Sequence, residues 1–215
     1  MNNLDAMAEE IRKELAAKDE AREKMLPLCR DSIRFSSVAI RAIHRQEFND
    51  AAKQIKLAHD VLAVAEKAVE KYSELANTGA VRDAQKELAE ANITLALVTG
   101  KKIPHAKELG VDVAAYLNGM GEAVGEIRRY LLDGMRSGDL SRGEELLGKM
   151  DDIYSVLVTM DFPDALTGGL RRTTDMVRGV MEKTRSDLTL TIRQKALEVR
   201  IADVITKESK SRKER

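Results

Sequence analysis

Apolar side chains recur along most of the chain at the three- and four-residue spacing of an amphipathic helix. The clearest stripe is Val81, Ala84, Leu88, Ala91, Leu95 and Val98. β-branched residues never gather into an alternating run of strand length, so the pattern predicts an all-α protein. The predicted helices span residues 4–48, 49–76, 81–98, 112–136, 141–160 and 170–205.

Glycine and proline divide these segments and predict one domain. Turn residues stand between the helices, at 77–79, 137–139 and 161–163, and the only proline expected within a helix is Pro27. Proline removes a backbone donor, so Pro27 is expected to kink or break the first helix. Six or seven helices with short connections form a helical bundle. We expect the helical domain to span residues 1–205 and residues 206–215 to form a basic, flexible tail.

Three glycines lie within the predicted fourth helix, at Gly119, Gly121 and Gly125. Each costs about 1 kcal/mol relative to alanine in a helix interior. Their density indicates that another backbone approaches this helix closely.

Composition restricts the class of protein. The 215 residues include 36 Lys+Arg and 36 Asp+Glu, so the formal net charge is zero and gives no electrostatic indication of a nucleic-acid partner. A single cysteine excludes a disulfide framework and a cysteine-rich zinc site. No apolar run approaches the roughly 18 residues of a membrane span, and the N-terminus lacks the order of a signal peptide. We therefore expect a soluble, cytoplasmic protein with no membrane partner.

Few residues of the chain indicate catalytic chemistry. Nucleotide-binding glycine loops and HExxH motifs are absent, and His44, His59 and His105 are isolated in sequence. We expect these histidines to be surface or internally bonded polar residues. The remaining candidates are two pairs of carboxylates, each on one face of its predicted helix: Glu87 with Glu90, and Glu122 with Glu126.

Four converging carboxylates would suit a hard divalent cation. Mg²⁺ and Mn²⁺ prefer oxygen ligands, and the two pairs would converge if their helices packed together there. Glu122 and Glu126 lie opposite the apolar stripe of their helix, beside small residues that would admit a ligand. An ordinary solvated face is the alternative, because pairs such as Glu10 and Glu14 have the same spacing. Arg82, Arg128 and Arg129 are candidate nucleic-acid contacts, and surface ion pairing is the alternative for them.

The segment 110–129 resembles the signature of the translin family. The matching residues are Asp112, Tyr116-Leu117-x-Gly119 and Gly125-Glu126-Ile127-x-Arg129, and the similarity extends over about residues 19–205. Glu87-x-x-Glu90-Ala91 and an acidic residue four before Glu126 resemble the nuclease branch, translin-associated factor X. Glu122 stands where that branch more usually has aspartate, which lengthens the side chain by one methylene. The shortness of the chain suggests a prokaryotic, archaeal member.

The resemblance implies a seven-helix bundle that assembles into a hollow homo-octamer enclosing nucleic acid, with the carboxylates facing inward. It also implies an endoribonuclease for single-stranded RNA, with Mg²⁺ or Mn²⁺ held by Glu87, Glu90, Glu122 and Glu126. One alternative is a non-catalytic oligomer that binds single-stranded RNA or DNA. Another is a purely structural helical protein, whose acidic pairs would be exposed ion-pair partners.

Overall fold

The computed structural model describes residues 3–213, and the side chains of residues 3–207. Within this range the chain is helical, with no strand. Six helices are long: α1 (Asn3–His44), α2 (Phe48–Val69), α4 (Gly79–Val98), α6 (Val113–Ser137), α7 (Gly143–Val158) and α9 (Leu170–Lys213). Three are four-residue turns of helix: α3 (Ser73–Ala76), α5 (Ala106–Leu109) and α8 (Asp164–Thr167). The prediction of a single all-α domain is confirmed.

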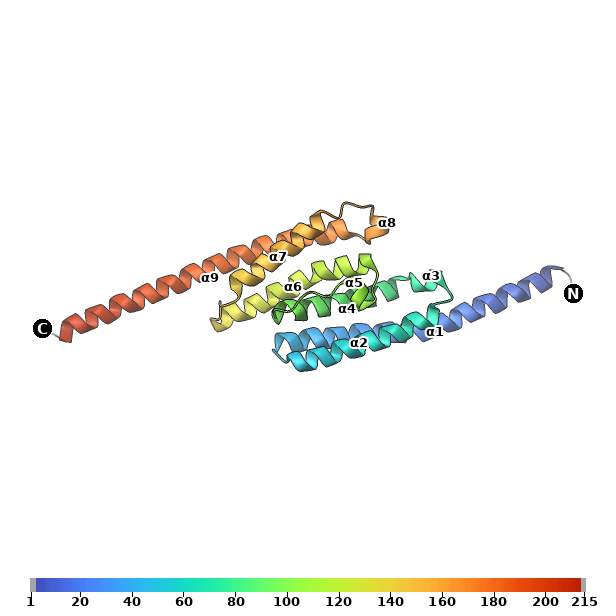
Figure 1. Cartoon of the computed structure of the whole chain (residues 1–215), viewed down its shortest axis with the longest axis horizontal. Helices are drawn as coiled ribbons and strands as arrows, with labels where there is room; N and C mark the ends of the chain where they lie inside the picture. Colours follow the sequence, from blue (N-terminus) through green and yellow to red (C-terminus); the bar gives the residue numbers. More distant parts are fainter. Residues whose placement is uncertain (1–2, 214–215) are drawn as a thin grey trace.

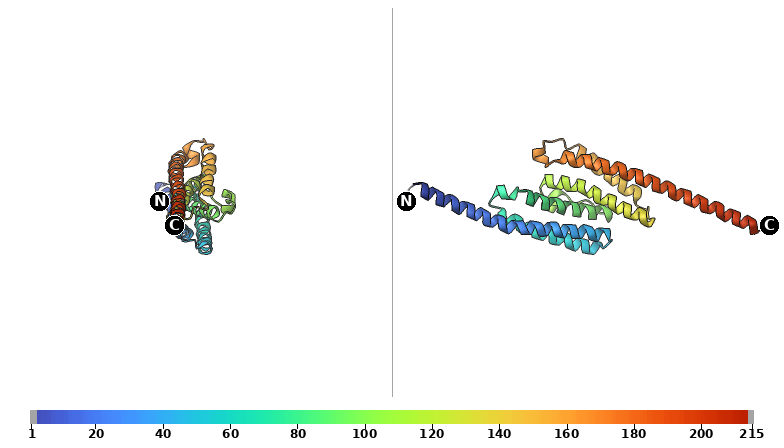
Figure 2. Two further views of the ribbon diagram at one scale, coloured as in Figure 1. Left: turned by 90° about the vertical axis from the view of Figure 1, so that its left-hand side faces the viewer. Right: turned by 180° about the vertical axis from the view of Figure 1, so that it is seen from behind.

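The long helices form three antiparallel hairpins stacked in layers (Figure 1). The α4–α6 hairpin lies in the middle, with α1–α2 on one side and α7–α9 on the other, and the two further views agree (Figure 2). The N-terminal part of α1 and the C-terminal part of α9 project beyond the bundle in opposite directions (Figure 1). The central hairpin is therefore the part of the chain that other helices surround most fully.

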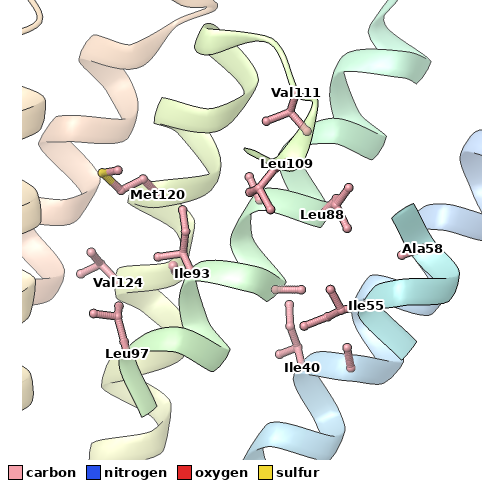
Figure 3. Packing of buried hydrophobic residues seen from close by; sticks show 14 of the residues in the cluster. Ile40, Ile55, Ala58, Leu88, Ile93, Leu97, Leu109, Val111, Met120 and Val124 are labelled. Atoms are coloured by element: carbon pink, nitrogen blue, oxygen red, sulfur yellow. The ribbon is translucent and has the colours of Figure 1, made fainter. Parts of the chain in front are cut away.

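The core forms where the apolar stripes of the layers meet (Figure 3). Ile40 of α1 and Ile55 of α2 face Leu88 of α4, and Ile93 of α4 packs near Val124 of α6. Leu88 and Ile93 are fully buried. Burying one such side chain contributes about 1.5–3 kcal/mol. The core lies along both sides of α4, which fixes the rotation of this helix about its axis.

Two expectations for α1 are corrected. The expected break at Pro27 does not occur: the helix continues through it, because the buried residues on either side, such as Met25 and Cys29, hold it in the core. The helix ends at His44, four residues earlier than predicted, because Gln46 adopts a left-handed conformation with φ of 62°. Phe48 then begins α2. A glutamine in this conformation is uncommon and gives no sequence signal for a turn.

The other helix boundaries follow the predictions closely, apart from α2 and α9. The predicted second helix ends at Val69 and is followed by the short helix α3. Asp112 caps α6 through its carboxylate, which accepts a hydrogen bond of 2.9 Å from the Ala114 amide, and Gly138 ends α6 in a left-handed conformation. Helix α9 continues through residue 206 to Lys213, and residues 214–215 lie outside the described range. The flexible tail stays a prediction.

Candidate metal centre

Three glutamates converge between α4 and α6. Glu87 and Glu90 are one turn apart on α4, and Glu122 lies on the facing side of α6. Each offers a carboxylate oxygen within 4.8 Å of the other two. We call these residues the acidic triad. The structure thus brings together three of the four glutamates that the sequence singles out.

Gly119 allows the two helices to approach at this point. A Cβ at Gly119 would lie 2.5 Å from the Lys86 carbonyl oxygen and 3.1 Å from the Glu90 amide nitrogen. Gly121 lies on the side of α6 that faces α9, and a Cβ there would clash with the Thr173 side chain. The predicted close approach of another backbone is therefore confirmed at Gly119, whereas the neighbours of Gly121 are side-chain atoms. At Gly125 a Cβ would meet nothing within 4 Å, so the prediction was wrong there.

The triad is electrostatically costly in the absence of a counter-ion. Glu90 is 7% exposed, and burial raises its pKa to about 8, with further contributions from the charges of Glu87, Glu122 and Glu126. Burial raises the pKa of Glu87 as well. Both shifts mean that the folded protein opposes full ionisation of the triad.

Lys86 supplies one neighbouring positive charge. Its Nζ lies 2.8 Å from Glu122 Oε1, and both side chains are about one-third exposed or less. Burial and the remaining carboxylates still raise the pKa of Glu90 with Lys86 in place. One lysine therefore leaves an excess of negative charge in the cluster.

Glu126 has a different partner, which sequence reasoning missed. Its Oε2 lies 2.5 Å from His44 Nε2, at the last residue of α1, and the His44 side chain is 5% exposed. His44 is thus an internally bonded polar residue, as expected for the isolated histidines, but it is placed beside the predicted site. The two residues are 82 positions apart, and no motif in the sequence links them.

The predicted arginine contacts fall into different environments. Arg128 bonds Asp187 at 2.7 Å and Thr184 at 3.1 Å, which ties α6 to α9. Arg129 is 58% exposed on its side chain and lies 4.0 Å from Glu126 Oε2. Arg82 is exposed on α4. Arg128 therefore already has protein partners, whereas Arg82 and Arg129 are accessible to a ligand.

A groove of about 870 Å³ lies directly beside the triad. Its walls come from α4, α6 and the region from α8 to the start of α9, and it includes Glu122 itself. Among the described residues, four cationic side chains line it, Arg82, Lys86, Arg171 and Arg172, together with the carboxylates of Asp83, Glu122, Asp164 and Asp175. An extended anionic chain in this groove would pass the carboxylates.

The donor set fits a hard divalent cation. The ligand atoms are carboxylate oxygens from two packed helices, and their convergence is compensated only in part by Lys86. Mg²⁺ and Mn²⁺ are bound by oxygen ligands of this kind. A cation would offset the charge repulsion that raises the pKa of Glu90.

Comparisons with known proteins place the chain in a family. A protein of Methanocaldococcus jannaschii, uncharacterized protein MJ0175, is 32% identical over 179 residues, which cover 81% of this chain and 78% of the relative. The crystal structure of AfC3PO and its complex with duplex RNA each match with a TM-score of 0.80 and 34% identity. The match covers 87% of this chain and 97% of AfC3PO in the complex. The chain belongs to the translin family.

Other comparisons agree on the fold. Apo-NeC3PO matches with a TM-score of 0.72 at 22% identity over 89% of this chain, which supports the fold alone. No family model matches the chain. The archaeal relative agrees with the archaeal origin that the sequence suggests for this translin-family protein. No helix among the described residues is long and apolar enough to cross a membrane.

The raised pKa of Glu90 predicts how pH affects the metal-free protein. Below about pH 4.5 Glu90 is protonated in both the folded and the unfolded chain, so it contributes no pH dependence. Between about 4.5 and 8 the folded chain keeps a proton that the unfolded chain has lost, so stability falls as pH rises. Urea unfolding of the metal-free protein at pH 5 and pH 8 measures this loss. A Glu90→Gln variant is expected to lack this component of the decrease, and an equal decrease in the variant would contradict the assignment.

Proposed function

We propose that this translin-family protein is a Mg²⁺- or Mn²⁺-dependent endoribonuclease. The observation that carries the proposal is the convergence of Glu87, Glu90 and Glu122 between α4 and α6. The chain has many exposed glutamates, but the packing of α4 against α6 brings these three carboxylates together and leaves Glu90 only 7% exposed. Repulsion among them is tolerated because a cation relieves it when bound.

The acidic triad would hold the cation, with Glu126 as a fourth ligand or an adjoining partner. When bound, the cation supplies charge neutralisation for a phosphodiester and a lowered pKa for water. The chain itself provides the remaining functions. The groove beside Glu122 binds the phosphate chain, Arg82 and Arg129 contact phosphates, and Lys86 lies between the groove and the triad.

RNA is the proposed substrate class, and its strandedness is a separate question. The resemblance of the sequence favours single-stranded RNA, with single-stranded DNA as a further partner. AfC3PO has been solved with duplex RNA. The basic side chains of the groove would contact the phosphate backbone of either form, because backbone contacts carry no base information.

A hollow homo-octamer in the cytoplasm is the proposed setting. The projecting parts of α1 and α9 support self-association, because they carry apolar side chains that the single chain leaves exposed: Leu4, Met7, Ile11, Leu15, Leu197, Val199, Ile201, Val204 and Ile205. Contiguous exposed apolar surface marks an interface more often than a free surface.

Cleavage of end-labelled RNA tests the proposal. Single-stranded and duplex forms of one sequence are incubated with the protein in Mg²⁺, in Mn²⁺ and in EDTA. We expect cleavage only with a cation, and a loss of at least about a hundredfold in Glu87→Ala and Glu90→Ala, because each removes a ligand. Glu70→Ala is the matched control, since Glu70 is an exposed glutamate directly after the end of α2. Undiminished cleavage in the triad variants would refute the assignment.

The alternative is an RNA-binding oligomer without catalysis. The observation that favours it is the Lys86–Glu122 ion pair, which places a resident cation on one of the proposed ligands. It predicts binding that weakens steeply with salt and no cleavage under any metal condition. The same assay, with a filter-binding measurement in parallel, separates the two functions.

A further inference from the structure

His44 lies where the end of α1 meets the middle of α6, and it bonds to Glu126 beside the proposed site. Its side chain is 5% exposed, and Nε2 lies 2.5 Å from Glu126 Oε2. The other ring nitrogen, Nδ1, is buried and has no hydrogen-bond partner among the described residues. The two nitrogens thus have unlike environments.

These environments determine the tautomer. A proton on Nδ1 would place a buried N–H donor without an acceptor, which costs about 1–3 kcal/mol or more. A proton on Nε2 instead faces a carboxylate oxygen, which is an acceptor when ionised. Of the two neutral tautomers, the one with its proton on Nε2 fits these environments, and in it His44 donates to Glu126 Oε2.

This hydrogen bond occupies one oxygen of the Glu126 carboxylate. Both partners of the carboxylate, His44 Nε2 at 2.5 Å and Arg129 Nη1 at 4.0 Å, contact Oε2. Oε1 has no protein partner within the described residues. Glu126 lies close enough to Glu90 for its charge to help raise the pKa of that residue. The carboxylate is thus held by one oxygen, with the other left for a ligand.

We propose that His44 is a positioning residue that orients Glu126 toward the cation of the acidic triad. The inference rests on the proposed function, and it assigns a role to a residue outside the family signature. Stability alone does not account for His44, because an apolar side chain would avoid the unpaired buried nitrogen. Partners that hydrogen-bond metal ligands typically change metal affinity about 10–100-fold when they are removed.

Two substitutions separate orientation from packing. His44→Gln keeps an amide donor near the position of Nε2, whereas His44→Leu fills the space without a donor. Mn²⁺ affinity is measured by the EPR signal of free Mn²⁺, and folding by thermal unfolding. We expect His44→Leu to bind Mn²⁺ at least about tenfold more weakly without a lower unfolding temperature, and His44→Gln to keep most of the affinity.

The dependence on Glu126 is tested in a double-mutant cycle. In a Glu126→Gln background, His44→Leu is expected to have no further effect on Mn²⁺ affinity. The inference is overturned if His44→Leu binds Mn²⁺ as tightly as the wild type, if His44→Gln weakens binding equally, or if the effect of His44→Leu persists in Glu126→Gln. Tight Mn²⁺ binding with an unaffected His44→Leu would refute this inference and leave the proposed function intact. Absence of Mn²⁺ binding in the wild type would refute both.

Nitrogen NMR of the ¹⁵N-histidine-labelled wild type gives a readout that needs no variant to fold. The chain has three histidines, and His44 is expected to carry a proton on Nε2. An Nε2 without a proton would overturn the inference.

Discussion

Replacing Glu90 with glutamine is expected to stabilise the metal-free protein and to abolish RNA cleavage. Burying Glu90 costs free energy because its carboxylate must either stay charged away from water or take up a proton. The neutral amide of glutamine needs neither. With a pKa of about 8 in the folded chain, removing this cost at neutral pH is worth on the order of 3 kcal/mol. For a chain of this size the unfolding temperature should rise by roughly 5–10 °C. Function changes in the opposite direction, because an amide is a weak ligand for a hard cation.

Two measurements on the same samples test this prediction. Thermal unfolding in EDTA at pH 7.5 compares Glu90→Gln with the wild type at equal protein concentration. Single-turnover cleavage in Mg²⁺ compares their rates, and a loss of at least about a hundredfold is expected. Glu70→Gln, at an exposed position, should change neither value. A Glu90→Gln protein that is both less stable and fully active would show that Glu90 is an ordinary packing residue.

Replacing Gly119 with alanine is expected to weaken the centre through the backbone. The new Cβ would lie 2.5 Å from the Lys86 carbonyl oxygen and 3.0 Å from the Ala89 Cβ, so α4 and α6 must separate. Overpacking of this kind costs about 1–3 kcal/mol, which exceeds the gain of about 1 kcal/mol from better helix propensity. Because Glu90 and Glu122 lie on the two helices being separated, Mn²⁺ affinity should fall together with stability.

Gly125→Ala is the matched control on the same helix. Its Cβ meets nothing within 4 Å, so only the helix propensity changes and stability should rise by about 1 kcal/mol. Urea unfolding and Mn²⁺ titration of both variants provide the comparison. Equal behaviour of Gly119→Ala and Gly125→Ala would mean that the helix contact at Gly119 does not position the triad.

Periodicity predicted most of the fold because each long helix has its own apolar stripe. The stripe of Val81, Leu88 and Leu95 predicts α4 from the sequence alone. The end of α1 was not predictable, because the left-handed turn at Gln46 depends on how α1 packs against α2. Pro27 predicts a break because proline is costly within an isolated helix. In the folded chain this cost is offset by the packing of α1 against other helices.

The candidate site was predictable only in its separate halves. The spacing of Glu87 with Glu90 placed two carboxylates on one face, but it did not determine which helix faces them. That information comes from the packing of Gly119 against α4. Residues whose roles depend on distant partners could not be predicted. His44 reaches Glu126 from another layer, and Arg142, one of many arginines in the sequence, caps α4 by donating to the carbonyls of Leu97 and Val98.

The location of a bound cation tests the central claim most directly. Crystals grown with Mn²⁺ and examined by anomalous diffraction show where the ion binds without reference to activity. The account predicts a Mn²⁺ peak between the carboxylates of Glu87, Glu90 and Glu122, which disappears in crystals of Glu90→Gln. An empty triad in the presence of Mn²⁺, with Lys86 still paired to Glu122, would contradict it.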